Sequence, residues 1–387
     1  MTRRLAIIGA GPIGIEAATL AAEKGWDVTV YETATPGASI RRWEHVKFFS
    51  PWAINRSSWG AKAVGTHVDE DAFPTGKAYL HDYLLPLAER LAERLQHNTR
   101  VLGIARRDAL KGDYIGQRDG NSGPFLLHIA GPNGERYDEA DVVFDTSGVY
   151  ESPAPLGVGG LDALGMSAIE NALERYIPDA LGAQRALYAD KRVLLIGAGH
   201  SAVTSLKILS DLRATAPKTQ IHWAFRQDAA PYTLIENDVL PERHALGEFG
   251  NRAAAGGIEG VTPYPGSTIE RFASNDDGIE VTLSRAAGNE TIVVDRVVSN
   301  VGYRPDLALT REIQVHQCYA SEGPMKLAAS LLASAGGDCM AQTSSGVDVL
   351  KSPEPNYFVL GAKSYGRNSS FLLRVGFDQI QEVLGSL

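Results

Sequence analysis

The pattern of apolar and polar positions near the start of the chain predicts a strand, a turn, a helix and a second strand. Residues 4–8 form a short apolar run typical of a buried strand. Glycines interrupt the sequence over residues 9–14, and residues 15–24 then follow a helical pattern. Residues 27–31 predict the second strand. This order is that of a βαβ unit, whose two strands lie parallel in one sheet.

The same order returns near the middle of the chain. Residues 192–196 predict a strand, residues 197–202 a glycine-containing loop, residues 203–212 a helix and residues 221–225 another strand. Two such units predict an α/β fold with two Rossmann-like dinucleotide-binding domains.

Shorter patterns predict additional layers. Apolar positions alternate in residues 125–129 and 279–283, as in strands of small β-layers with one buried face. Residues 324–333 predict a helix. Near the end, residues 357–361 predict a strand and residues 371–384 a closing helix.

The first glycine loop has the spacing that suits a dinucleotide. Gly9 permits a tight turn, Gly11 lets the backbone approach a pyrophosphate, and Gly14 lets the helix pack closely on the strand. The following strand ends at Glu32, whose carboxylate can hydrogen-bond ribose hydroxyls. A purely structural glycine turn is the alternative. The candidate binding residues here are Gly9, Gly11, Pro12, Ile13, Gly14 and Glu32.

The second loop differs from the first in the charge that follows it. Its second strand leads to Arg226, which can pair with the 2′-phosphate of NADP, so NADPH is favoured over NADH. In the alternative, Arg226 is only solvated at the strand end, and the nearby Asp228 supports that reading. We interpret His200 as a loop spacer and not as a catalytic base. The candidate residues here are Gly197, Gly199, His200, Ser201, Ala202 and Arg226.

Length and composition exclude several classes of protein. The 387 residues suit two domains, and 44% hydrophobic with 21% charged residues is typical of globular chains. A formal net charge of −9 without a concentrated basic patch argues against nucleic-acid binding. The first apolar run breaks at Gly9, too early for an export signal, and no run reaches about 18 apolar residues. We therefore expect a cytoplasmic protein and no membrane association.

The order of several motifs resembles that of the two-dinucleotide-binding flavoproteins, among them flavin-containing monooxygenases, lysine and ornithine N-hydroxylases and thioredoxin reductases. Besides the two loops, Phe73-Pro74-Thr75-Gly76 before residues 79–84 is similar to a segment of the monooxygenases. Asp145-Thr146-Ser147-Gly148 resembles the crossover that leaves the flavin domain, and Val301-Gly302-Tyr303-Arg304-Pro305 the one that returns. The resemblance covers most of the chain.

This resemblance implies a discontinuous FAD-binding domain, residues 1–155 and 295–387, with an NADPH-binding domain, residues 156–294, inserted into it. FAD is then expected at the first loop and NADPH at the second. Gly148 at the crossover and Gly361 near the end of the chain are further expected FAD contacts.

Two departures from the family pattern stand out. The strand near the C-terminus should end in Gly-Asp, whose carboxylate holds the flavin ribityl chain, but Gly361 is followed by Ala362. Lys363, Ser364 and Asn368 are candidates for other contacts. The F-x-G-x-x-x-H fingerprint of the monooxygenases should precede the second loop, yet residues 176–191 contain no histidine. The second departure weakens the oxygenase interpretation specifically.

The aromatic segment at residues 41–55 follows the first βαβ unit, and in the relatives it runs along the flavin. Trp43 and His45 are therefore expected to contact FAD, and Asn55 is our candidate for the polar group facing the reactive flavin edge. An aromatic core cluster with a satisfied histidine is the alternative. Cys318 and Cys339 lack C-x-x-C spacing, so they offer neither a zinc cluster nor an adjacent redox pair, and we expect no metal site. We expect two buried, inert thiols, and the alternative is that the two cysteines converge as a redox or metalloid-binding pair.

The expected function is that of an FAD-dependent NADPH oxidoreductase. The resemblance favours a flavin-containing monooxygenase that oxygenates a small nitrogen or sulfur nucleophile with molecular oxygen, through a flavin C4a-hydroperoxide. One alternative is an NADPH-dependent reductase that passes electrons to a small acceptor or partner protein, and another is a flavin-binding sensor without turnover. The substrate is a small molecule of unidentified structure. The oligomeric state is left open, a homodimer included.

Overall fold

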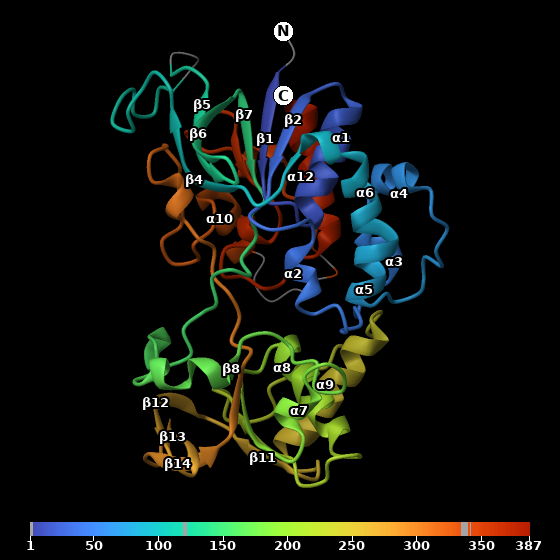
Figure 1. Cartoon of the computed structure of the whole chain (residues 1–387), viewed down its shortest axis with the longest axis vertical. Coiled ribbons are helices and arrows are strands. Elements are labelled where there is room, and N and C mark those ends of the chain that lie inside the picture. Colours follow the sequence, from blue (N-terminus) through green and yellow to red (C-terminus); the bar gives the residue numbers. More distant parts are fainter. Residues whose placement is uncertain (1–2, 119–121, 334–339, 341) are drawn as a thin grey trace. The chain divides into compact units, whose positions relative to one another are not determined.

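The computed structural model describes residues 3–118, 122–333, 340 and 342–387 and divides into two compact units (Figure 1). Unit 1 consists of Met1–Ser152 together with Tyr303–Leu387, and unit 2 is Pro153–Gly302. The chain therefore leaves unit 1 once and returns to it once.

Unit 1 is built on a five-stranded parallel sheet with the strand order β16-β7-β1-β2-β3. Its register places Ile8, Tyr31, Asp145 and Val359 side by side at one edge. Because these four residues end their strands, the segments that follow β1, β2, β7 and β16 all begin at the same edge. The strands are β1 Arg4–Ile8, β2 Asp27–Tyr31, β3 Leu95–Gln96, β7 Val142–Asp145 and β16 Tyr357–Val359.

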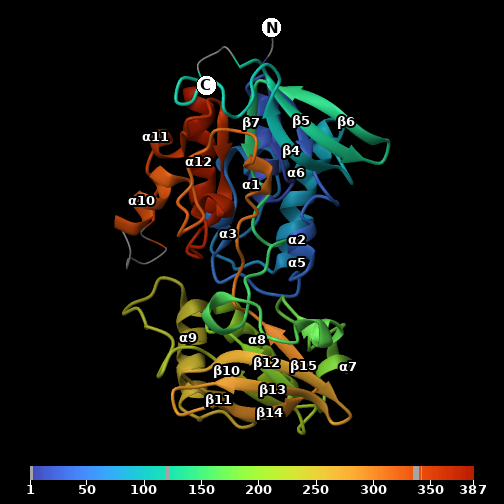
Figure 2. The ribbon, with the colours of Figure 1, turned by 90° about the vertical axis from the view of Figure 1, so that its left-hand side faces the viewer.

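Alternating residues of the central strand bury the two faces of this sheet against different layers. Leu5 and Ile7 share a core with helices α1 (Pro12–Glu23) and α12 (Leu373–Ser386). Ala6 and Ile8 share another core with a three-stranded antiparallel sheet. Figure 2 shows this small sheet and α12 on opposite sides of the parallel sheet. Its strands are β4 Arg100–Arg106, β5 Phe125–Gly131 and β6 Gly134–Ala140.

A run of short helices lies between β2 and β3 and packs partly on α1. Ser57 and Thr75 start two of them, since each side chain accepts a hydrogen bond from a backbone amide of the first turn. These helices are α2 Ala38–Arg41, α3 Trp52–Asn55, α4 Ser58–Val64, α5 Gly76–Tyr79, the π-helical turn Leu80–Leu84 and α6 Leu85–Arg90. The later part of unit 1 adds α10 Met325–Ala333, α11 Val347–Leu350 and the 3₁₀ turn Gly361–Tyr365.

Unit 2 repeats the same plan with a second five-stranded parallel sheet, order β11-β10-β9-β15-β8. Val193 and Leu195 share a core with helix α8, whereas Leu194 and Ile196 pack against another three-stranded sheet. The sheet strands are β8 Leu173–Glu174, β9 Arg192–Ile196, β10 Gln220–Ala224, β11 Val261–Tyr264 and β15 Arg296–Ser299. The covering elements are α7 Arg185–Tyr188, α8 His200–Leu212, α9 Pro241–Ala254, β12 Thr268–Asn275, β13 Gly278–Ser284 and β14 Glu290–Val294.

The α/β fold with two Rossmann-like units, expected from the sequence, is confirmed. The expected return at residues 294/295 is displaced, however, and unit 2 ends at Gly302. The reason is β15, which pairs with β9 in the middle of the second sheet and had not been recognised as a strand. The expected first boundary, 155/156, lies close to the observed one at Ser152.

Two glycine turns let each helix start directly at the end of its strand. Gly9 has a positive φ of 99°, and a Cβ there would come within 2.8 Å of the Thr146 carbonyl oxygen. A Cβ on Gly14 would overlap the carbonyl oxygen of Gly9. In unit 2, Gly197 has a φ of 119°, and a Cβ would overlap the carbonyl oxygen of Asn300. Only glycine fits at these positions, because the backbones touch.

In the described part of the chain, no helix combines the length and the apolar character needed to cross a bilayer.

Candidate functional site

The first loop leaves open space where a phosphate would approach. Around Gly11, no heavy atom lies within 4 Å of the position that a Cβ would take. Gly11 is also the N-cap of α1, and Pro12 occupies the first turn, so the unpaired amides of the helix start lie beside this space. A helix N-terminus attracts anions. Ile13 and Gly14, in contrast, are buried and serve packing.

Glu32 lies next to this loop, as the strand register requires. Its Oε2 accepts a hydrogen bond from the Ala10 amide at 2.8 Å, and its Oε1 accepts one from the Ala34 amide at 2.9 Å. The carboxylate is thus held at the end of β2, beside the glycine turn. This is the place from which a carboxylate reaches the ribose in dinucleotide folds.

Two further glycines border the first loop. Gly148, with a φ of 72°, has open space around the Cβ position in the crossover after β7. Gly361, with a φ of 74°, follows β16 and approaches Ile13 so closely that a Cβ would lie 3.0 Å from the Ile13 Cγ1. The fold therefore brings the four expected elements of this site, the loop, Glu32, Gly148 and Gly361, to one edge of the sheet.

Trp43 and His45 both carry a buried nitrogen without a partner. The Trp43 Nε1 and the His45 Nε2 are shielded from solvent, and among the described residues neither has a hydrogen-bond partner. The Trp43 ring packs against Phe48 at 5.2 Å between ring centroids, and Gly76 lies against the same ring. An unpaired buried polar atom is costly unless a ligand or water completes it. The two nitrogens are therefore candidates for contacts to a bound group.

Asn55 is buried, and its amide is fully engaged within its own segment. Its Nδ2 donates to the carbonyl oxygens of Ser50 at 3.0 Å and Pro51 at 2.8 Å, and its Oδ1 accepts from the Ser50 hydroxyl at 3.2 Å. These contacts brace the turn before α3. The structure adds no evidence for the catalytic role expected of Asn55, which stays a prediction.

The sequence analysis missed a buried ion pair at the first site. Lys363 Nζ lies 2.7 Å from Asp145 Oδ2, and both side chains are almost completely buried. Burial alone raises the pKa of the Asp145 carboxyl, but the Lys363 ammonium and hydrogen bonds from Lys363 and Ser147 outweigh it and hold that pKa below its usual range. The signal was present in the sequence as an aspartate in the crossover and a lysine next to Ala362.

The second loop repeats the geometry of the first. No heavy atom lies within 4 Å of a Cβ position on Gly199, which is the N-cap of α8. Trp223 Nε1 donates to the Gly197 carbonyl at 2.8 Å and fixes the turn. Ala202 is fully buried under the helix start, whereas Ser201 is exposed in the first turn. The open side of Gly199 is therefore available to a phosphate.

His200 starts α8 and is not arranged as a base. Its ring lies 6.4 Å from that of Tyr232, between centroids. Desolvation and the positive charge of Arg243 together lower the pKa of His200. A lowered pKa favours the neutral ring at physiological pH.

Arg226 is exposed one residue beyond Phe225, at the carboxyl end of β10. Among the described residues it forms no ion pair, and Asp228 lies instead beside Gly266. The register of β9 and β10 pairs Ile196 with Ala224, so Arg226 and the second loop leave the sheet at the same edge. This placement would allow Arg226 to contact the 2′-phosphate on the ribose of NADP.

Cys318 is half-exposed rather than buried, and Cys339 lies outside the described residues. Hydrogen bonds from Ser321, and from the backbone amide of Ala320, lower the pKa of the Cys318 thiol. A lowered pKa increases the thiolate fraction and hence reactivity. The sequence expectation of an inert thiol therefore does not describe the surroundings of Cys318.

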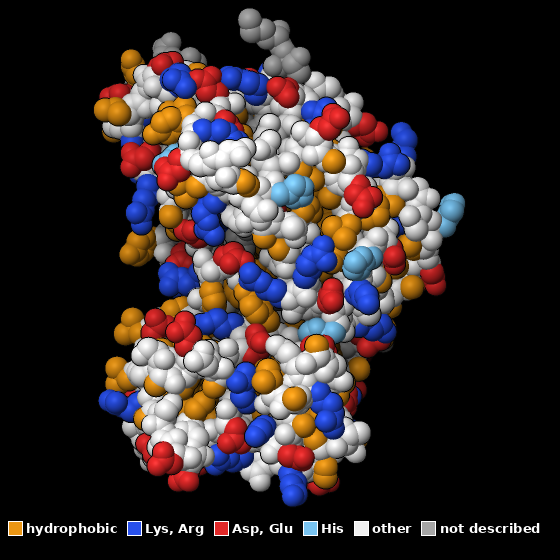
Figure 3. Space-filling view, in the orientation of Figure 1, with side chains coloured by type: hydrophobic (Ala, Val, Ile, Leu, Met, Phe, Trp, Pro, Cys, Tyr) orange, Lys and Arg blue, Asp and Glu red, His pale blue; other side chains and the backbone are white. Residues whose placement is uncertain are grey.

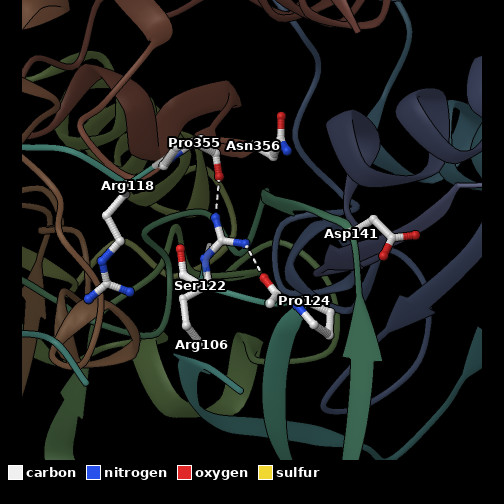
Figure 4. Close-up of a pocket in the computed structure, with 8 residues that line it drawn as sticks. Arg106, Arg118, Ser122, Pro124, Asp141, Pro355 and Asn356 are labelled. Carbon is white, nitrogen blue, oxygen red and sulfur yellow. Dashed lines mark hydrogen bonds between the residues drawn. The ribbon is translucent and has the colours of Figure 1, made fainter. Parts of the chain in front are cut away.

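A separate hollow opens at the opposite edge of the first sheet, where β7 and β16 begin (Figure 4). Arg106 crosses it and donates to the Gly123 carbonyl at 3.0 Å and to the Pro355 carbonyl at 2.5 Å. Its Nε lies 2.7 Å from the buried Glu354 carboxylate. Arg106 is therefore used for packing, whereas the buried Nε and Nη1 of Arg118 have no hydrogen-bond partner among the described residues. On the molecular face in Figure 3, basic side chains lie among acidic ones.

Known proteins resemble this chain mainly in structure. Residues 6–112, which contain the first loop and Glu32, match the family model of pyridine nucleotide-disulphide oxidoreductases. Among curated proteins, none matches the sequence.

Solved structures match over the whole chain. The bacillithiol disulfide reductase of Bacillus cereus has a TM-score of 0.73 at 18% identity, covering 100% of this chain and 98% of that one. The ornithine N-hydroxylase of Kutzneria sp. 744, solved with reduced FAD, NADP⁺ and L-ornithine, has a TM-score of 0.68 at 14% identity, covering 100% and 99%. The thioredoxin reductase of T. acidophilum reaches 0.59 at 14% identity, covering 99% of each chain.

At these identities the likeness establishes the fold, and it agrees with the family match at the first loop. The chain thus has the fold of the two-dinucleotide-binding flavoproteins, and residues 6–112 match the family model of pyridine nucleotide-disulphide oxidoreductases.

Proposed function

We propose that the protein is an FAD-dependent NADPH oxidoreductase. The observation that carries this proposal is the pair of open glycine cradles, at Gly11 and Gly199, each at a helix N-terminus and each at the carboxyl edge of its own parallel sheet. A non-catalytic flavin sensor has no need for the second cradle.

The residues around the first cradle fit FAD. Glu32 is held where ribose hydroxyls come within reach, and Gly11 leaves room for the pyrophosphate. The unpaired nitrogens of Trp43 and His45 are suited to hydrogen-bond a polar group of the flavin or its ribityl chain. These residues bind and orient, since the cofactor itself supplies the redox chemistry.

The second cradle fits NADPH. Gly199 leaves room for the pyrophosphate at the start of α8. Arg226 carries a guanidinium at the same sheet edge. A guanidinium there can donate a charge-assisted hydrogen bond to the 2′-phosphate, whereas a carboxylate in its place would repel that phosphate. When bound, the nicotinamide supplies a hydride to the flavin, which then passes electrons to oxygen or to another acceptor.

For the second half of the reaction we propose oxygenation of a small nitrogen or sulfur nucleophile. This proposal is supported by the segment Phe73 to Leu84, which is similar to a segment of the monooxygenases. In it, Thr75 caps α5 and Gly76 packs on Trp43. That contact joins the segment to the expected flavin site. We further propose a cytoplasmic location, a small-molecule substrate and, as the simplest assembly, a homodimer.

The specific observation that favours a second candidate, a reductase, is the half-exposed thiol of Cys318 with its lowered pKa. A reactive thiol suits electron transfer to a disulfide, but that chemistry also needs a resolving partner. Ser321 occupies the position three residues later, where a C-x-x-C pair has its second cysteine. The oxygenase therefore remains the first candidate.

Replacing Gly11 by valine should abolish FAD binding without unfolding the protein, because the added side chain fills open space that only the pyrophosphate uses. The measurement is the flavin content of purified protein together with its thermal midpoint. Gly14→Val is the matched contrast, since that side chain would overlap Gly9 and should lower stability by about 1–3 kcal/mol. Full flavin content in the Gly11 variant would show that this loop is not the FAD site.

Arg226→Ala should raise the KM for NADPH by about tenfold and leave the KM for NADH nearly unchanged, because only NADPH has the extra phosphate. Arg252→Ala is the control, since Arg252 is exposed near the carboxyl end of α9. A crossover helix runs antiparallel to its strands, so this end lies away from the cradle. Equal effects of Arg226→Ala on both cofactors would remove Arg226 from this role.

Rapid mixing with oxygen separates the two candidate reactions. The protein is first reduced with NADPH under anaerobic conditions and then mixed with oxygenated buffer while its absorbance spectrum is recorded. For the oxygenase we expect a transient whose spectrum differs from those of oxidised and reduced flavin. Direct return to the oxidised spectrum would instead support the reductase.

A double variant, Cys318→Ser with Cys339→Ser, should retain both NADPH-driven flavin reduction and the reaction with oxygen. Neither step of the proposed oxygenase uses a thiol. Each half-reaction is followed separately by its absorbance change, after circular dichroism has verified folding. Loss of either one in the folded variant would contradict the oxygenase and point to a thiol-dependent reductase.

A further inference from the structure

Lys363 follows Ala362, the position at which this chain departs from its relatives. The strand β16 should be followed by Gly-Asp, and here Gly361-Ala362 is followed by Lys363 in the 3₁₀ turn Gly361–Tyr365. The Lys363 side chain is 2% exposed, which is unusual for an ammonium group. The expected acid is thus replaced by a buried cation one residue later.

The ammonium is held by the crossover that follows β7. Lys363 Nζ donates to Asp145 Oδ2 at 2.7 Å and to the Ser147 hydroxyl at 2.9 Å. Asp145 Oδ2 also accepts from the Tyr357 hydroxyl at 3.0 Å, and its Oδ1 accepts from the Ser147 hydroxyl at 2.6 Å. Both carboxylate oxygens are therefore used, and the pair is fixed in one geometry.

This network lies directly behind the first glycine loop. A Cβ on Gly9 would come within 2.9 Å of the Ser147 Cα, so Ser147 touches the tight turn. On the other side, Gly361 packs against Ile13, inside the same loop. The network consequently joins the end of β7, the end of β16 and the loop that we assign to the pyrophosphate.

A buried ion pair is weak evidence for stability, because desolvation of the two charges offsets much of their attraction and apolar residues of similar size often hold the same elements as well. An ammonium has three donors, and among the described residues two of those of Lys363 have partners. A role toward the ligand accounts for the pair better than packing does.

We propose that Lys363, held by Asp145, is a positioning residue for the flavin dinucleotide, and that it takes over the part of the missing Gly-Asp carboxylate at the β16 side of the cradle. This inference rests on the proposed function, since it assumes FAD at the first loop. It goes beyond that function because it assigns part of the affinity for FAD to Lys363 and Asp145, which lie outside the glycine motif.

The test compares two ways of losing a buried ion pair in unit 1. The double variant Asp145→Asn with Lys363→Met removes both charges and keeps one acceptor oxygen, which can still serve the Ser147 hydroxyl. Arg106→Met is the control for stability, because it breaks a similarly buried pair at the opposite edge of the sheet and leaves Glu354 without its ion-pair partner. Each protein is stripped of flavin, its thermal midpoint is measured, and FAD is titrated back by fluorescence.

We expect the double variant to keep a thermal midpoint close to that of the wild type while its Kd for FAD rises about tenfold, equal to about 1.4 kcal/mol. Arg106→Met should lower the midpoint and leave the Kd nearly unchanged. If the double variant does not fold, the single variant Lys363→Met serves, since Asp145 can then take up a proton.

An unchanged Kd in the folded double variant would overturn this inference alone. An equal loss of affinity in Arg106→Met would also overturn it, because the effect would then be one of general stability. A wild-type protein that does not bind FAD at all would instead overturn the proposed function, and this inference with it.

Discussion

The close contact of backbone with backbone at the two glycine turns is the constraint on which the rest of the structure depends. At Gly14 and Gly197 a side chain would overlap a carbonyl oxygen of the neighbouring segment, so each helix can start against its strand only without a Cβ. This contact points the helix N-terminus at the carboxyl edge of the sheet. The open positions at Gly11 and Gly199 follow from it, since the same turn exposes one glycine while it buries the others.

The parallel sheets bring the residues of each candidate site to one edge. Because all strands of a sheet run in one direction, residues far apart in sequence meet at one edge: Ile8, Tyr31, Asp145 and Val359 in unit 1. The segments that follow them carry Gly9, Glu32, Ser147 and Gly361. In unit 2 the same rule places Gly197 and Arg226 together. The two units thus share one architecture and differ in the charge at the strand end, an acid in the first and an arginine in the second.

The buried charged side chains of unit 1 are positioned by tertiary packing, and no short sequence motif marks their partners. Glu16 lies on α1 and is completely buried, and its carboxylate accepts from the Ser57 hydroxyl at 2.6 Å and from Tyr83. Desolvation raises the pKa of Glu16, which favours its protonated form, whereas the ammonium of Lys363 keeps Asp145 ionised. The helix core therefore tolerates a carboxyl that can become neutral, and the crossover holds one whose charge is balanced.

The sequence by itself determined both βαβ units, the glycine roles and the position of Glu32, since these depend on spacing over short distances and on the missing Cβ. It missed β15, because a four-residue strand has too little pattern of its own and is recognisable only by its pairing with β9. The role of Asn55 at the flavin edge stays a prediction, and in the structure its amide contacts Ser50 and Pro51. The partnership of Lys363 with Asp145 was decided only by the tertiary structure, because burial and charge pairing depend on which strands lie side by side, and no local pattern records that.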